Sequence, residues 1–316
     1  MMIGSGEIEG YPVLTIGSQQ DGGVEAAFAP GAGMVGCSLR HGGDELLGQR
    51  NGLRGYAEER STMGIPLLYP WANRLAGPRF ELAGREVDVA AAEPPPKLDG
   101  NGLPIHGLLS AAPGWSVLRH AARDDGGVLS ARFDFEPAGA LTAGFPFPHR
   151  LELTATVVGR TLSVRTKVDA DRGGPVPIAF GFHPYLTLPG APRSEWRLRA
   201  PLGTRLELDS RGLPTGARSP AEPLDGPLGD TTYDDAFLAP RYGQPFELSG
   251  GGRRISVAFG AGYDYAQLYA PPDAELIAIE PMTAPTNALL TGGEELRVIE
   301  PGGHFEAEFA ITVADE

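Results

Sequence analysis

The chain has 316 residues, of which 40 are acidic and 26 basic, and its formal net charge is −14. This charge disfavours binding to nucleic acid and to anionic membrane surfaces, so a neutral small molecule fits best as a ligand. No stretch approaches the run of about 18 apolar residues that a membrane span needs. The single cysteine, Cys37, excludes an intrachain disulfide and a cysteine-based zinc site.

The spread of 45 Gly and 30 Pro residues along the chain leaves little room for long helices and favours short strands joined by turns. The first residues contain neither a basic segment nor an apolar run, so we expect no secretory signal and a cytoplasmic protein. Length alone favours two domains. Because no repeat and no clear linker divides the chain, we predict one domain over residues 1–316.

Alternating apolar residues predict an opening hairpin over residues 11–28. The following segment, residues 31–36 with the sequence GAGMVG, matches the glycine pattern of dinucleotide-binding loops. However, Pro30 precedes it and Gly42-Gly43 interrupts the helix that should follow. We therefore interpret it as a turn and exclude nucleotide binding. A short helix is predicted over residues 53–64.

Two polar motifs follow in the first half of the chain. Asn73-Arg74 comes directly after an apolar segment that ends in Pro70-Trp71-Ala72, and His106 stands between Ile105 and Gly107. A guanidinium donates several hydrogen bonds in a fixed fork, which suits sugar hydroxyls or a carboxylate. A solvated arginine in a loop would show the same pattern.

The clearest local structure is a hairpin in the middle of the chain. Residues 151–158 and 161–168 both alternate apolar and polar side chains, and Gly159-Arg160 connects them. A two-residue connection that begins with glycine is typical of a type II′ turn between antiparallel strands.

The segment Ile178–Tyr185 predicts a strand with one bulky face and one small face. Its alternation places three bulky apolar residues on one side, and Ala179, Gly181 and His183 on the other. Pro184 cannot donate to a ladder, so we expect the strand to end at His183. The pattern predicts the floor of a cavity with His183 beside it, whereas the alternative is a histidine that is merely hydrogen-bonded in a core.

Further strands are predicted over residues 196–200, 255–259, 265–269, 276–280 and 305–313, and a long loop is predicted between residues 210 and 232. Strands nowhere alternate with long helical patterns, so a parallel α/β sheet is excluded. The predicted fold is all-β, a large antiparallel β-sandwich with few short helices.

Three polar residues stand on or beside these later strands. Glu280 shares a strand face with apolar residues, and Pro281 should close its strand; a partly desolvated carboxylate there has a raised pKa and is a stronger base. Gln267 shares a face with two tyrosines, which can hold a pyranose or form part of the core. Asp234, like Asp235, is expected at a loop-to-strand junction, where either could be only a turn former.

Together these motifs resemble one family, the aldose 1-epimerases or galactose mutarotases. The resemblance rests on Asn73-Arg74 with Gly77 and Phe80, His106-Gly107, His183-Pro184-Tyr185, Tyr233-Asp234-Asp235 with Phe237, and Ile279-Glu280-Pro281 with Asn287. The order and rough spacing of these motifs run through most of the chain. The sequence after Glu280 differs from that of galactose-specific members and resembles a broader bacterial branch.

The resemblance implies a single-domain galactose mutarotase-like supersandwich with an open cleft that binds a free sugar. It implies no cofactor, no metal and a monomer or homodimer. In this family a residue like His183 is the general acid to the ring oxygen, and one like Glu280 is the general base to the C1 hydroxyl. The residues that the resemblance assigns to substrate binding are Asn73, Arg74, His106, Tyr185, Asp234 and Gln267.

Interconversion of α and β anomers needs one proton donor and one proton acceptor. Each such group contributes on the order of 10²- to 10⁴-fold. We expect His183 and Glu280 to face each other across a hollow wide enough for a hexose ring. We also expect His183 to be protonated part of the time, because a nearby carboxylate such as Asp234 would favour the imidazolium.

Three other functions stay open. A glycoside hydrolase would need two carboxylates roughly 5 to 9.5 Å apart, such as Glu280 with Asp234 or Asp235. A hexose-6-phosphate 1-epimerase of the same fold would need a cluster of Arg or Lys near the mouth of the cleft, for which Arg74, Arg79 and Arg40 are the candidates. The third alternative is a sugar-binding protein without turnover.

Overall fold

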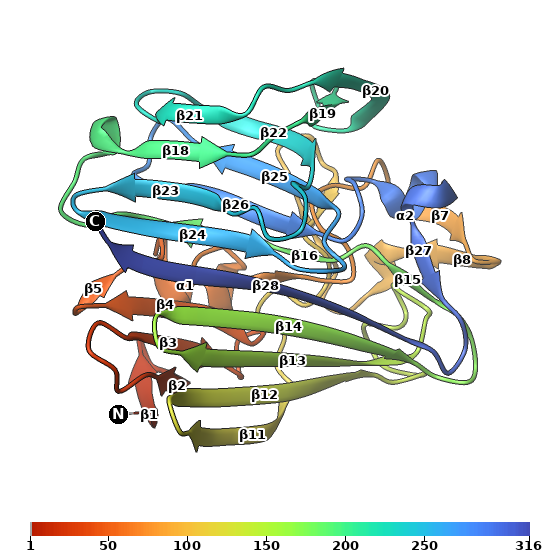
Figure 1. The fold of residues 1–316 in the computed structure, drawn as a ribbon. Helices are drawn as coiled ribbons and strands as arrows, with labels where there is room; N and C mark the ends of the chain where they lie inside the picture. The colour runs from red at the N-terminus through yellow and green to blue at the C-terminus, as the bar shows by residue number, and fades with distance from the viewer. Residues whose placement is uncertain (1) are drawn as a thin grey trace.

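Antiparallel sheets make up most of the computed structural model, which describes residues 2–316 (Figure 1). The largest sheet has nine strands, in the order β11 (Ser116–Arg123), β12 (Gly126–Phe135), β13 (His149–Val158), β14 (Thr161–Ala170), β28 (His304–Asp315), β24 (Arg253–Phe259), β23 (Phe246–Gly250), β18 (Arg197–Ala200) and β21 (Leu224–Pro227). An eight-stranded sheet contains β20 (Pro214–Pro220), β19 (Thr204–Leu208), β22 (Tyr233–Leu238), β25 (Tyr265–Ala270), β26 (Ile277–Met282), β16 (Gly181–Phe182) and β6 (Leu67–Leu68), with β17 (Tyr185–Leu186) also paired to β26.

A third sheet has five strands, β1 (Ile3–Ile8), β2 (Tyr11–Gly17), β3 (Val24–Ala29), β4 (Val35–His41) and β5 (Asp44–Glu45). Three strand pairs complete the β-structure: β7 (Arg79–Leu82) with β8 (Arg85–Asp88), β9 (Lys97–Leu98) with β10 (Pro104–Ile105), and β15 (Val176–Ile178) with β27 (Arg297–Ile299). The helices are α1 (Gly52–Glu59), α2 (Ala288–Thr291) and the 3-10 turns Val89–Ala91, Arg193–Glu195 and Gly293–Glu295. The prediction of an all-β antiparallel sandwich with few short helices is confirmed.

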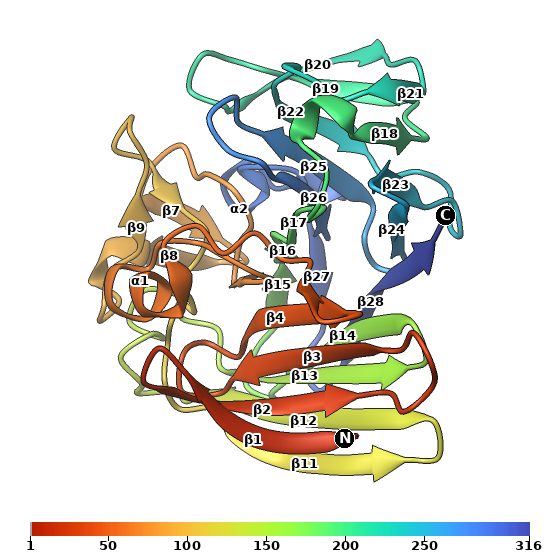
Figure 2. The same ribbon diagram turned by 90° about the vertical axis from the view of Figure 1, so that its left-hand side faces the viewer.

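The lower half of the molecule is a sandwich of the five-stranded sheet on strands β11 to β14 (Figure 2). The apolar residues of β13 at Leu151, Leu153, Ala155 and Val157 are buried, while the residues between them lie on the solvent face. The predicted hairpin is confirmed, since Val158 pairs with Thr161 and Gly159 has the positive φ, +54°, that a type II′ turn requires at its first central residue. The opening hairpin is likewise present as β2 paired with β3.

The eight-stranded sheet packs on the other half of the large sheet. The ring of Phe182 lies 5.0 Å from that of Phe309 on β28, and Phe180 lies 6.1 Å from Phe305. The bulky face of the predicted His183 strand therefore faces the core, as its alternation indicated. The opposite face of this segment is left to Gly181 and His183.

The His183 segment is not one strand ended by Pro184. It consists of β15, β16 and β17, because the chain changes its pairing partner twice: β15 pairs with β27, β16 with β6 and β26, and β17 again with β26. His183 and Pro184 form the break between β16 and β17, and pairing resumes at Tyr185.

Pro281 does not close its strand either. It lies inside β26, opposite Ala266, and the strand continues to Met282. The amides of Ile279 and Thr283, on either side of it, donate to Pro184 O and Phe180 O. The missing N–H of Pro281 therefore falls opposite the break between β16 and β17, where no ladder bond is lost.

Two other boundaries differ from the predictions. Helix α1 ends at Glu59, because Arg60 adopts the left-handed conformation with φ +54°, so the predicted helix over residues 53–64 is too long. The region between residues 210 and 232 is not only loop, since it contains β20 and β21. Asp234 and Asp235 follow Tyr233, the first residue of β22, so the predicted loop-to-strand junction is confirmed, and both belong to the strand and not to a turn.

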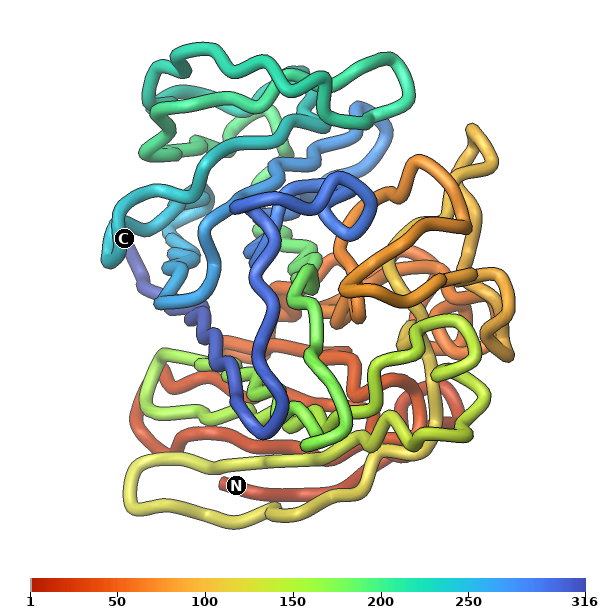
Figure 3. The backbone as a smooth tube through the Cα atoms, turned by 90° about the vertical axis from the view of Figure 1, so that its right-hand side faces the viewer, coloured from red at the N-terminus to blue at the C-terminus, as the bar shows by residue number. Residues whose placement is uncertain are grey.

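The segment from about residue 60 to residue 110 runs along one side of the eight-stranded sheet and lies beside α2 (Figure 3). Isolated bridges join Trp71 to Ala179 and Tyr69 to Gly107. His106 N–H donates to Asn73 O at 2.9 Å, and both residues have positive φ, +62° and +56°. Two motifs far apart in the sequence are thereby fixed next to the His183 segment. No helix among residues 2–316 is long and apolar enough to cross a membrane.

Candidate functional site

One face of β25 and β26 carries polar side chains that are buried, although polar groups are rare in a protein core. Glu280 pairs in register with Gln267, and both side chains are buried, with 2% and 0% of their surface exposed. Ala278 and Tyr185 on one side, and Met282 with Tyr265 on the other, provide apolar neighbours along this face. The polar pair therefore sits between two apolar clusters on the face opposite the main core.

His183 is in direct contact with Glu280. Its Nε2 lies 3.2 Å from Glu280 Oε1, and only 5% of the histidine is exposed. The expectation that the two groups face each other across a ring-sized hollow is therefore wrong: they are side by side. The break between β16 and β17 is what allows the imidazole to approach β26 at the level of Glu280.

Tyr185 stacks on the imidazole of His183. The two rings are stacked, with centroids 4.2 Å apart and planes 18° from parallel. The Tyr185 hydroxyl lies 3.3 Å from His183 Nε2 and 2.7 Å from Thr62 Oγ1, and it accepts a hydrogen bond from Arg50 Nη1 at 3.3 Å. The sequence carries no signal for Arg50 or Thr62, because neither belongs to a motif and both lie on irregular backbone.

Arg74 lies at the more exposed end of the site and is held by carboxylates. Its Nε donates to Asp99 Oδ2 at 2.8 Å, its Nη1 to Asn73 Oδ1 at 3.0 Å, and its Nη2 lies 3.8 Å from Asp234 Oδ2. Gln267 Nε2 donates to Asp234 Oδ1 at 2.7 Å, which connects this network to the buried floor. The sequence carries no signal for Asp99, and only the fold shows that it orients Arg74.

His106 lies against His183, with the two rings edge to face and their centroids 5.6 Å apart. Burial lowers the pKa of His106 to about 3, with the positive charges of Arg74 and Lys97 acting in the same direction. His106 is therefore a neutral imidazole at physiological pH. The fold brings together all eight residues predicted for the site: Asn73, Arg74, His106, Tyr185 and His183 with Asp234, Gln267 and Glu280.

Burial shifts the pKa values of the central pair in opposite directions. It lowers the pKa of His183 well below the usual value, and the positive charge of Arg50 acts in the same direction. It raises the pKa of Glu280 well above the usual value, and the Asp234 carboxylate adds to this. The expectation that Asp234 favours the imidazolium is wrong, because burial disfavours the charged form of His183 and the Asp234 carboxylate acts instead on the pKa of Glu280.

Four buried polar atoms at this site have no hydrogen-bond partner within the described chain: His183 Nδ1, Glu280 Oε2, Gln267 Oε1 and His106 Nδ1. Buried polar atoms are satisfied in the great majority of cases, so unsatisfied ones need an explanation. Four of them on neighbouring side chains give the site free bonding capacity for a polar ligand.

The site offers no obvious place for a metal ion, since no group of three or more His, Cys, Asp and Glu side chains with suitable spacing occurs in residues 2–316. Two of the arginines that could have contacted a phosphate are paired elsewhere. Arg79 Nε donates to Asp88 at 2.8 Å, and Arg40 Nε lies 3.6 Å from Glu45.

Several solved structures share this fold. A galactose mutarotase-like protein from Clostridium acetobutylicum superposes with a TM-score of 0.83 at 18% identity, over 99% of this chain and 98% of that one. A galactose 1-epimerase from Lactobacillus acidophilus superposes with a TM-score of 0.77 at 14% identity, over 99% and 98%. An aldose epimerase homologue from C. elegans gives 0.75 at 18%, over 99% of both chains. These similarities establish the galactose mutarotase-like fold.

The sequence model of the Aldose 1-epimerase family matches residues 18–312, nearly the whole chain. The protein belongs to the aldose 1-epimerase family. None of the curated proteins compared with the chain matches it.

Proposed function

We propose that this protein interconverts the α and β anomers of a free aldose, with His183 and Glu280 as the acid and base. The observation that carries the proposal is the buried contact between Nε2 and Oε1 at 3.2 Å, in which each partner keeps a second polar atom free of hydrogen bonds. Membership of a family of isomerases supports the same reaction class.

The side-by-side geometry fits the reaction. The oxygen that loses a proton, on the C1 hydroxyl, and the ring oxygen that gains one are both bonded to C1. An acid and a base that lie side by side can therefore reach both oxygens from one side of the sugar ring. The contact between His183 and Glu280 is compatible with this arrangement.

The proton count also balances within the pair. When the ring opens, His183 gives a proton to the ring oxygen, the C1–O bond to that oxygen breaks, and Glu280 takes the proton of the C1 hydroxyl. After rotation about the C1–C2 bond the ring closes on the other face, and both protons return. The pair thus alternates between two arrangements of a single proton, and its Nε2 and Oε1 atoms lie 3.2 Å apart.

The remaining residues provide contacts for sugar hydroxyls. Arg74 and Gln267 Nε2 are donors, Asp234 and Gln267 Oε1 are acceptors, and neutral His106 can be either. Asp99 and Asp234 already offset the charge of Arg74, so this network favours an uncharged sugar over a phosphorylated one.

Polarimetry tests the proposal. We expect the protein to accelerate the change in optical rotation of freshly dissolved α-D-glucose or α-D-galactose, and His183→Gln to lower kcat by about 10²- to 10⁴-fold. His304→Gln, which alters an exposed histidine, is the matched control and should retain full activity. Three results would contradict the proposal. No acceleration with either sugar would indicate a binding protein, and acceleration with glucose 6-phosphate alone would indicate a phosphosugar epimerase. Release of the aryl alcohol from aryl glycosides would indicate a hydrolase.

The pH profile of kcat is a second test. Since the pKa of His183 is lowered and that of Glu280 is raised, the pair holds one proton over a broad range on both sides of neutrality. We expect kcat to be constant across that range, to fall in acid when the pair gains a second proton, and to fall in alkali when it loses its only one. A narrow optimum near neutrality would contradict this account.

A further inference from the structure

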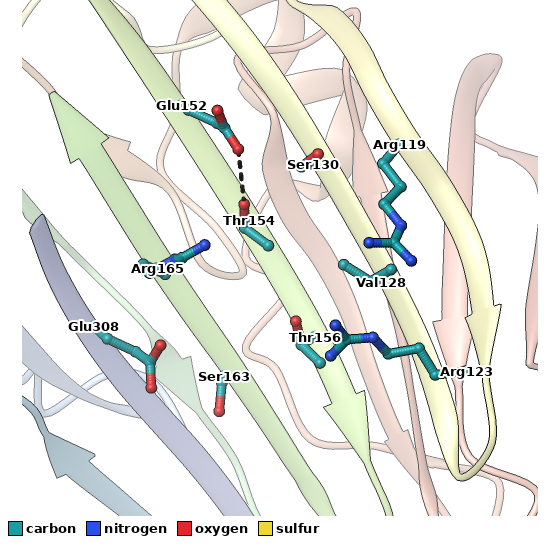
Figure 4. A pocket seen from close by; sticks show the side chains of 10 residues that line it. All are labelled: Arg119, Arg123, Val128, Ser130, Glu152, Thr154, Thr156, Ser163, Arg165 and Glu308. Carbon is teal, nitrogen blue, oxygen red and sulfur yellow. Dashed lines mark hydrogen bonds between the residues drawn. The ribbon is translucent and has the colours of Figure 1, made fainter. Parts of the chain in front are cut away.

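The solvent face of the nine-stranded sheet contains a polar hollow that the proposed reaction does not use. It has a volume of about 460 Å³ and lies over β11, β12, β13, β14 and β28 (Figure 4). The side chains that line it are Arg119, Arg123, Val128, Ser130, Glu152, Thr154, Thr156, Ser163, Arg165 and Glu308. This volume lies within the range of small-molecule sites.

The strand register explains why a hollow forms there. One cross-strand row runs Arg119, Ser130, Thr154, Arg165 and Glu308, and the next runs Ala121, Val128, Thr156, Ser163 and Ala310. Short side chains occupy the middle of both rows, while long charged ones stand at the ends of the first. The hollow is therefore a consequence of side-chain length on an otherwise continuous sheet face.

The floor presents hydroxyl groups from Ser130, Thr154, Thr156 and Ser163. A hydroxyl can donate and accept, and four of them on adjacent strands suit a ligand that carries several hydroxyls of its own. Thr154 has a weak contact of 3.4 Å to Glu152 (Figure 4).

Two of the three arginines around this floor lack acidic partners. In the part of the chain that the structure describes, no carboxylate oxygen lies within 4.0 Å of the guanidinium nitrogens of Arg119 or Arg123, whereas neighbouring Arg132 and Lys167 pair with Asp134 and Asp169. Arg165 is partly offset by Glu306 at 3.8 Å. The guanidinium of Arg123 extends from the edge strand toward Thr156, over the floor (Figure 4). Two uncompensated guanidiniums in a chain of net charge −14 indicate a site for an anion.

We propose that this hollow binds a small anionic polyol, a sugar or sugar alcohol with one phosphate or carboxylate group. Arg119 and Arg123 bind the anionic group, and the hydroxyl floor binds the polyol. Glu152 and Glu308 accept hydrogen bonds from ligand hydroxyls and repel a polyanion, so the site excludes nucleic acid and sulfated polysaccharide. The site lies on a different sheet from His183 and Glu280, and it is independent of the reaction proposed above.

Isothermal titration calorimetry of the full chain at low salt tests this site with open-chain ligands, which have no anomers. We expect D-glucitol 6-phosphate or D-gluconate to bind, and neutral D-glucitol not to bind; the tighter of the two anions identifies a phosphate or a carboxylate site. The double variant Arg119→Gln/Arg123→Gln should weaken binding at least about tenfold, because it removes charge-assisted hydrogen bonds. The variant Thr154→Val should weaken the binding of glucitol 6-phosphate but not that of inorganic phosphate.

The matched control is Arg40→Gln/Arg79→Gln, which removes the same charge from exposed arginines on other strands and should leave binding unchanged. Glu280→Gln should also bind the probe normally, which distinguishes this site from the catalytic one. Four results would each overturn the proposal. Binding could be unchanged in the Arg119/Arg123 variant, or the control variant could lose as much affinity. Neither anion could bind, or a heparin oligosaccharide could bind more tightly than both.

Discussion

Two buried histidines of this molecule differ in how completely they are hydrogen-bonded. His149 and His183 are 2% and 5% exposed, and each stacks on an aromatic ring, Phe135 at 4.4 Å and Tyr185 at 4.2 Å. His149 Nδ1 contacts Phe147 O and its Nε2 contacts the Tyr69 hydroxyl, both at 2.5 Å. His183 has no hydrogen-bond partner at Nδ1. Its Nε2 contacts the carboxyl group of Glu280, whose other oxygen, Oε2, also has no partner.

The bonding around His149 fixes one proton position. Because Phe147 O can only accept, Nδ1 carries the proton, and Nε2 accepts from Tyr69. Around His183 no such choice is forced, because Glu280 can either donate or accept a proton. Burial and stacking are therefore common to a structural and a candidate catalytic histidine, and the free bonding capacity is what distinguishes them.

The largest expected effect comes from removing the proton acceptor beside His183. Glu280→Gln keeps the shape of the side chain and removes its basicity, so we expect kcat for mutarotation to fall by about 10²- to 10⁴-fold. The free energy of unfolding should not fall at pH 8, because a neutral amide avoids the desolvation of a buried carboxylate. Polarimetry and urea unfolding measure the two effects. Glu222→Gln, at an exposed position, is the control, and more than a tenth of the wild-type activity in Glu280→Gln would refute the role.

Acid should destabilise the protein through its neutral, buried histidines. Burial lowers the pKa of His149 to about 4, although the Phe147 carbonyl acts in the opposite direction, whereas an unfolded histidine titrates near 6.5. The unfolded chain therefore binds protons that the folded chain rejects as pH falls from about 6.5 to about 4. His149 alone should lower the free energy of unfolding by about 3 kcal/mol across that window, and His106 acts with the same sign.

Urea unfolding at pH 7.5 and pH 4.5 measures this loss. Glu280 opposes it, because its raised pKa favours proton uptake by the folded state. The variant His149→Phe should show a shallower dependence on pH than the wild type. Identical slopes for the two proteins would contradict the assignment of acid sensitivity to His149.

At neutral pH, His149→Phe should reduce stability and leave the reaction intact. The phenyl ring leaves the Tyr69 hydroxyl and the Phe147 carbonyl without partners, at a cost of about 2 kcal/mol. Urea unfolding and polarimetry at 25 °C check both expectations. The matched change His183→Phe should abolish activity instead. A loss of kcat in His149→Phe without unfolding would remove the distinction between the two histidines.

Alternation along the sequence was sufficient for the sheet faces, whereas the pairing of His183 with Glu280 was expected from the resemblance to the family. The bulky face of Ile178–Phe182 does enter the core, and Glu280 does share its face with Ala278. Strand ends were less predictable. Pro184 and Pro281 were each expected to end a strand, but Pro184 lies in the break in pairing between β16 and β17, and Pro281 lies within β26 opposite that break. Such a break depends on which strands become neighbours, and local sequence does not determine that.

The supporting residues could not be predicted for a related reason. Arg50, Thr62 and Asp99 act through contacts with residues 135, 123 and 25 positions away, and none stands in a regular element whose period would reveal its face. His149, by contrast, begins a strongly alternating strand, yet its sequence neighbours do not show that Tyr69 and Phe147 satisfy it.

The smallest expected effect comes from Arg50, which contacts His183 only through Tyr185. Its Nη1 donates to the Tyr185 hydroxyl, and its guanidinium lies 5.3 Å from the ring centroid. We expect Arg50→Met to lower kcat by about three- to tenfold, as the loss of about 1 kcal/mol of positioning energy implies, with little change in KM. Its positive charge also lowers the pKa of His183, so the acid limb of the kcat profile should move to higher pH in the variant. Arg54→Met, on α1, is the neighbouring control, and an acid limb that does not move would show that Arg50 serves only the local fold.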